Sequence, residues 1–111
     1  MVNSSTRVTA IFGALADPTR RRMLASLSRG GEQPEATLRR PFRMSAPAIS
    51  KHLRVLEKAG LIHRRRRGRE HWIRRRSEGL KPAQDWMAHC AAGWEFSFDA
   101  LENLVRKEKR K

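Results

Sequence analysis

The sequence predicts a mostly helical fold with one small β-hairpin, in a single domain that spans residues 1–111. A chain of this length provides enough material for one domain with a thin core. Apolar residues recur at helical spacing along most of the chain. The pattern changes after Gly60, where two short apolar strings flank a glycine, as in two strands joined by a turn.

The N-terminal part predicts two helices and a short third one. The first has an apolar face at spacing i, i+3, i+4 and i+7, formed by Val8, Ile11, Phe12 and Leu15. Asp17 and Pro18 then form a typical helix start, because aspartate caps the first turn and proline is tolerated at its first position. Gly30-Gly31 and Pro34 break the chain before the third helix, over about 35–40.

A further helix, which is amphipathic, is expected over about 45–59. Ser45 is a good N-cap, and Gly60 stands where a helix end favours a left-handed residue. One face carries Ile49, Leu53 and Leu56, and the opposite face is polar and basic. Two short helices joined by a tight turn, the second with such an outer face, are typical of a helix-turn-helix, and this second helix would be its recognition helix.

The residues from about 61 to 75 predict a two-stranded ribbon around Gly68. Eight arginines lie between positions 64 and 76, and Glu70 is the only acid there. An arginine-rich ribbon directly after a helix-turn-helix is a wing, for which we expect contact with phosphates or the minor groove.

The last helix is expected over about 80–106. Leu80, Met87, Trp94 and Leu101 repeat every seven residues, and Ala83, Cys90, Ser97 or Phe98, and Leu104 fill the other half of the stripe. A heptad stripe on a terminal helix needs a partner, and the simplest partner is a second copy of the chain.

The charge of the chain is strongly positive and unevenly spread. Lys and Arg number 25 against 11 Asp and Glu, a net charge of +14, which favours a polyanionic partner. Residues 82–105 contain four acids and no Lys or Arg, which a protein that only coats nucleic acid would not need. No apolar run reaches the roughly 18 residues of a membrane span, so we expect a cytoplasmic protein without membrane contact.

Together these patterns closely resemble the winged helix-turn-helix repressors of the ArsR/SmtB type, especially their metal-independent branch. The likeness lies in Phe12–Arg22 (FGALADPTRRR), Ser45–Ile62 (SAPAISKHLRVLEKAGLI) and Arg66–Arg69 (RRGR), and it extends over roughly residues 8–105. The resemblance implies a homodimer that places two recognition helices in successive major grooves of double-stranded DNA.

The resemblance also assigns site residues. It implies groove contacts from Ser45, Ala46, Pro47, Ser50 and Lys51, backbone contacts near His52 and Arg54, and wing contacts from Arg66, Arg67 and Arg69. The first and last helices would form the dimer interface through Val8, Ile11, Phe12, Leu80, Met87, Cys90, Trp94 and Leu101.

Two residues depart from the family pattern. Ala46 stands where many members have glutamine, so one base reader is missing. Arg39 stands where a small residue is usual for close helix packing. We therefore expect specificity to depend on Ser50, Lys51 and DNA shape.

No metal or cofactor is expected. The third helix lacks the cysteine pair of one family metal site, and no second histidine completes the other. Asp85 and His89, four residues apart, are interpreted as a helical side-chain pair, and Cys90 as a small interface hydrophobe, with redox sensing as the alternative. No catalytic constellation is present, so an enzyme is excluded.

The sequence therefore predicts a dimeric, sequence-specific DNA-binding transcriptional repressor that acts by promoter occlusion, with a small-molecule or protein effector left open. Two alternatives are a non-specific basic RNA- or nucleoid-binding protein and a protein-interaction module that docks through its C-terminal helix. Two roles are left open for His52, packing or phosphate contact. Two are also left open for Arg20–Arg22, contact with a polyanion or a solvated surface.

Overall fold

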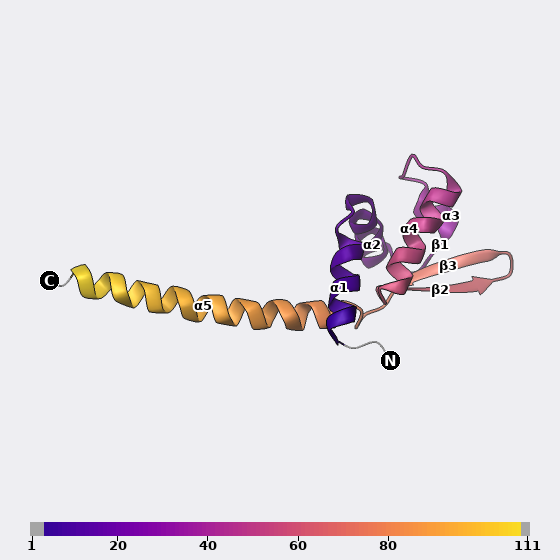
Figure 1. Cartoon of the computed structure of the whole chain (residues 1–111). Coiled ribbons are helices and arrows are strands. Elements are labelled where there is room, and N and C mark those ends of the chain that lie inside the picture. The colour runs from indigo at the N-terminus through magenta and orange to yellow at the C-terminus, as the bar shows by residue number, and fades with distance from the viewer. Residues whose placement is uncertain (1–3, 110–111) are drawn as a thin grey trace.

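The computed structural model describes residues 4–109, without the side chains of residues 4, 95–98 and 108–109. The chain is mostly helical with a small antiparallel sheet, as the sequence predicts (Figure 1). Its elements are α1 (Ser4–Leu15), α2 (Pro18–Gly30), β1 (Gln33–Pro34), α3 (Glu35–Arg39), α4 (Ala46–Lys58), β2 (Ile62–Arg67), β3 (Glu70–Arg75) and α5 (Lys81–Lys109).

The sheet contains one strand that the sequence pattern did not predict. Its order is β1-β3-β2, with both pairs antiparallel. In the two-residue strand β1, Gln33 lies opposite Ile73 and Pro34 lies opposite Trp72. Two residues are too few for an alternating pattern, and a proline is tolerated because β1 is an edge strand. This strand joins the base of the wing to the start of α3.

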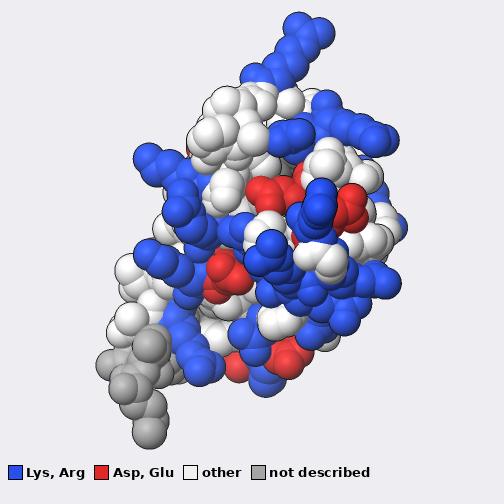
Figure 2. Space-filling view, turned by 90° about the vertical axis from the view of Figure 1, so that its right-hand side faces the viewer, with Lys and Arg blue, Asp and Glu red and all other residues white. Residues whose placement is uncertain are grey.

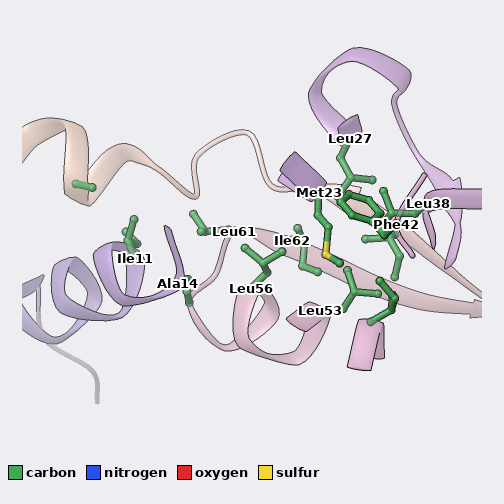
Figure 3. Close-up of a cluster of buried hydrophobic side chains, with 14 residues drawn as sticks. Ile11, Ala14, Met23, Leu27, Leu38, Phe42, Leu53, Leu56, Leu61 and Ile62 are labelled. Atoms are coloured by element: carbon green, nitrogen blue, oxygen red, sulfur yellow. The ribbon is translucent and has the colours of Figure 1, made fainter. Parts of the chain in front are cut away.

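The core is apolar and lies between the first four helices and the base of the wing. Figure 3 shows side chains from α1, α2, α4 and β2 converging, among them Ile11, Met23, Leu56 and Ile62. The predicted inner face of the helix after Ser45 is fully buried. Among the described residues the core contains no buried polar or charged residue, so packing of apolar surface holds these elements together.

Both ends of α4 are defined by local hydrogen bonds. The Ser45 hydroxyl oxygen accepts a bond from the Ala48 amide at 3.2 Å. At the other end Gly60 has φ 76°, its amide donates to the Glu57 carbonyl, and the Leu61 amide donates to the Leu56 carbonyl, both at 3.0 Å. This pair of bonds is a Schellman motif, which leads the chain directly into β2.

Helix α5 packs on the domain only at its beginning. Ala83 is buried, and Leu80, just before the helix, packs against the core. The helix then leaves the domain on the side opposite to the wing (Figure 1), and the molecule measures 74 × 34 × 21 Å. None of the helices in residues 4–109 is long and apolar enough to cross a membrane.

Candidate nucleic-acid interface

The outer face of α4 presents polar and basic side chains to solvent. Ala46, Pro47, Lys51 and Arg54 are exposed, and Ser50 is half-buried. Because Ser45 uses its oxygen as an acceptor for the Ala48 amide, its hydroxyl hydrogen stays available to an external acceptor. The N-terminus of α4 also carries the positive end of the helix dipole, which favours phosphate.

A groove of about 430 Å³ separates the start of α4 from α3 and the wing. It is lined from α3 by Arg39, from α4 by Ala46, Pro47 and Ser50, and from the wing by Arg69 and His71. Three residues expected to face DNA thus line the same opening as a wing arginine. The groove joins the helix and the wing into one continuous surface.

Three of the wing arginines are held by contacts within the protein. Arg64 and Arg65 face acids at the sheet edge: Arg64 Nη2 lies 3.7 Å from Glu35 Oε2, and Arg65 Nε lies 2.7 Å from Glu32 Oε1. At the tip, Arg66 Nε donates to the carbonyl of Gly68 at 3.3 Å. These contacts fix the two strands and the turn between them.

The other arginines of the wing project charge outward. The Arg67 guanidinium stacks on the ring of Trp72, 4.5 Å from its centroid. Arg69, Arg74, Arg75 and Arg76 are exposed and form no ion pair with the described residues. Figure 2 shows the face of the molecule at this end, where Lys and Arg cover much of the surface and Asp and Glu form small patches. The surface is suited to a polyanion.

His52 lies against the start of α2 rather than out in solvent. Its Nδ1 is 3.3 Å from Arg20 Nη1 and 3.9 Å from Asp17 Oδ2. The Arg20 amide donates to Asp17 at 3.0 Å and thereby lowers the pKa of that carboxyl below its ordinary value, an effect to which the nearby His52 and Arg20 charges add. The histidine therefore links the recognition helix to the cap of α2.

The arginine run at 20–22 binds the protein itself. Arg20 donates from Nε to the Ala14 carbonyl at 2.6 Å and from Nη2 to the Gly13 carbonyl at 3.1 Å. Arg21 donates to the Leu15 carbonyl at 2.6 Å, and the Arg22 guanidinium lies over a phenylalanine ring. These bonds satisfy the last carbonyls of α1, where cations are favoured by the helix dipole. The sequence feature that could have predicted this role is the end of α1, which lies only a few residues before the arginine run.

The residues expected at a dimer interface divide into buried and exposed ones. Ile11 is 1% exposed and packs in the core of its own chain, while Val8, Leu80 and Cys90 are half-buried. The remaining four are substantially exposed: Phe12 37%, Met87 46%, Trp94 68% and Leu101 58%. Trp86, Leu104 and Val105 add to this apolar surface, and Trp86 packs edge-on against Phe12 at 5.7 Å. Ser97 and Phe98 have side chains outside the described ones.

Metal-ligating side chains are scattered in the part of the chain that the structure describes, where no three of His, Cys, Asp or Glu lie together. The expected pairing of Asp85 with His89 is not found. Asp85 instead faces Lys81, one turn earlier, with Oδ2 3.7 Å from Nζ. A lysine at this spacing offers the carboxylate an opposite charge.

Comparison with known proteins agrees with this geometry. Residues 15–65 match a helix-turn-helix domain family. The chain is 34% identical over 77 residues to the transcriptional repressor SdpR of Bacillus subtilis. The aligned region covers 69% of this chain and 84% of that protein. The chain is 32% identical over 101 residues to the arsenical resistance operon repressor of Escherichia coli, covering 90% and 83%.

Solved structures give the same result. A crystal structure of an ArsR family transcriptional regulator has a TM-score of 0.78 at 36% identity, over 86% of this chain and 97% of that one. An ArsR-like regulator from Rhodococcus sp. RHA1 has a TM-score of 0.75 at 27% identity, over 90% and 93%.

The fold and its basic surface define a winged helix-turn-helix DNA-binding protein. The chain belongs to the ArsR family of transcriptional regulators. It is a DNA-binding transcriptional repressor and not an enzyme.

Proposed function

We propose that the chain represses transcription as a homodimer that lays its two α4 helices in successive major grooves and thereby covers a promoter. The observation that carries this proposal is the position of two complementary surfaces. The basic face of α4 and the wing lies at one end of the molecule, and the exposed apolar side of α5 extends from the other (Figure 1). A dimer joined through α5 leaves both basic surfaces free for one duplex.

The proposed DNA contacts follow the surface described above. Lys51 and Ser50 face the base edges with the first turn of α4, formed by Ser45, Ala46 and Pro47. Arg54 and the arginines Arg66, Arg67 and Arg69 of the wing contact the sugar-phosphate backbone or the minor groove, and His52 orients α4 from behind. Contacts with bases supply specificity, and contacts with phosphate supply much of the affinity.

The proposed dimer rests on the chemistry of α5. Trp94 is 68% exposed and Leu101 is 58% exposed, on the helix that extends away from the domain. They repeat at heptad spacing with Met87, and such a stripe is buried when two copies align. The same proposal includes regulation without a metal and a cytoplasmic location beside the DNA. It also includes an effector that acts on this interface.

The test combines oligomeric state with DNA binding. Leu101→Glu places a charge in the apolar stripe, and Ala92→Glu adds the same charge on the opposite side of α5. We expect the wild-type chain and Ala92→Glu to sediment as dimers and to bind the duplex upstream of their own gene at two chains per site. Leu101→Glu should sediment as a monomer and bind this duplex about 100-fold or more weakly. Two separate chains do not have the high effective concentration at the second half-site that a joined pair has.

Two results would contradict the proposal. If Leu101→Glu remains dimeric with unchanged DNA affinity, α5 is not the interface. If the wild-type chain binds a scrambled duplex of equal composition as tightly as the native one at physiological salt, its basic surface is non-specific.

A further inference from the structure

Arg39 is a cation in the groove between α3 and α4 that forms no ion pair with the described residues. Its side chain is half-buried, and it forms no hydrogen bond or ion pair with the described residues. Glu35, one turn earlier on α3, is the natural partner by spacing, but its carboxylate faces Arg64 of the wing at 3.7 Å. Glu70 also lines the groove, but no ion pair joins it to Arg39, so the Arg39 guanidinium keeps its donors for an external acceptor.

The α4 residues that line the groove offer few polar side-chain groups. Ala46 carries no donor or acceptor in its side chain, and Pro47 also lacks an amide hydrogen. Of the α4 residues that line the groove, only Ser50 offers a polar side chain. The first turn of the recognition helix thus leaves a space beside the base-facing surface that a long side chain from α3 can cross.

We infer that Arg39 reads a guanine from α3, through the space left by Ala46. The inference rests on the proposed placement of α4 in the major groove. There guanine presents N7 and O6 side by side as acceptors, and the planar fork of arginine matches both. Ala46, Pro47 and Ser50 line the groove and belong to the face of α4 that is proposed to meet the bases, so a side chain that extends along the groove would reach base edges. In this inference the base-reading side chain lies on α3, the helix before the recognition helix.

A matched control lies next in the chain. Arg40 is exposed, does not line the groove, and ends α3 with its amide donating to the Thr37 carbonyl. Arg39→Ala and Arg40→Ala therefore remove the same charge from the same helix. Arg39→Lys keeps the charge but removes the two-pronged donor geometry.

The experiment is selection of bound duplexes from a random pool by the wild-type chain and these three variants. We expect the wild-type chain and Arg40→Ala to select a guanine that Arg39→Ala and Arg39→Lys no longer select, with preference reduced about 10- to 100-fold. Replacing that guanine by 7-deazaguanine should weaken DNA binding by the wild-type chain and leave DNA binding by Arg39→Ala unchanged. Circular dichroism and melting temperature establish that each variant is folded.

The outcomes separate this inference from the proposed function. Equal loss of affinity on every duplex in Arg39→Ala would make the residue a phosphate contact, and an unchanged guanine preference would remove it from recognition; either overturns the inference alone. A folded wild-type chain that selects no sequence would overturn the placement of α4 and the inference with it.

Discussion

Single residues at the ends of α4 decide where the recognition helix begins and stops. Gly60 stands at φ 76°, in the left-handed region, where a Cβ costs about 1–2 kcal/mol. No heavy atom lies within 4 Å of a Cβ built there, so the cost is conformational rather than steric crowding. The position shows how one glycine connects the helix to the wing.

Replacing Gly60 by alanine should therefore lower the free energy of unfolding by about 1–2 kcal/mol. Gly13→Ala is the control, because Gly13 lies inside α1 with open space around it and alanine favours a helix interior by up to about 1 kcal/mol. Urea denaturation measures both. A Gly60→Ala protein as stable as the wild type would contradict the left-handed geometry.

Asp17 makes stability depend on pH. Its folded pKa lies below the ordinary value of 3.8, chiefly through the Arg20 amide, so its contribution is present above that value and is lost as pH falls through the folded pKa. Asparagine also caps helices but does not titrate in this range. The stability advantage of the wild type over Asp17→Asn should therefore shrink between roughly pH 5 and roughly pH 2. Urea midpoints measure the difference; a constant one would contradict this account.

At the scale of elements, helices and strands with a local signal could be predicted, and features that depend on a distant partner could not. The faces with Ile49, Leu53 and Leu56 repeat over several turns, and the caps at Asp17 and Ser45 carry local signals. Strand β1 has two residues and owes its pairing to β3, almost forty positions later. The bonds from Arg20 to the end of α1 depend in the same way on how α1 and α2 meet.

The candidate site divides along the same line. The exposed face of α4 and the charged wing follow from residue spacing within each element. The groove beside Arg39 depends on the distance between α3 and α4, and the burial of Ile11 depends on which side of α1 meets the core. The residue spacing gives the apolar face of α1, but it gives neither the distance between α3 and α4 nor whether Ile11 packs in its own core or against a second copy.

The wing predicts a measurable salt dependence. Arg69 is exposed and unpaired among the described residues, so it is available to a phosphate. Arg69→Ala should reduce the slope of log affinity against log salt by about 0.9. Arg106→Ala removes the same charge from α5, where Arg106 pairs with Glu102 at 2.8 Å, and should leave the slope unchanged. Fluorescence anisotropy across a salt series decides, and equal slopes in both variants would exclude the Arg69 contact.

At the scale of the whole molecule, the proposed dimer fixes one spacing between half-sites. Two recognition helices on a rigid dimer fit major grooves about one helical turn apart. Inserting five base pairs between the half-sites turns the second half-site to the opposite face of the duplex, so affinity should fall to that of a single half-site. A gel-shift series with inserted base pairs measures this. Full affinity at every spacing would mean that the two domains move independently.

The guanidinium of Arg20 bears on that spacing. It joins Gly13 and Ala14 of α1 to His52 of α4, while α1 itself contacts α5 near its beginning, where Phe12 packs against Trp86. Apolar surfaces can slide over one another, but hydrogen bonds hold donor and acceptor along set directions. Arg20 therefore connects the recognition helix to α1, and α1 in turn contacts the long helix. In the proposed dimer we expect a rotation of α5 relative to its domain to move α4 and so to change the distance between the two recognition helices.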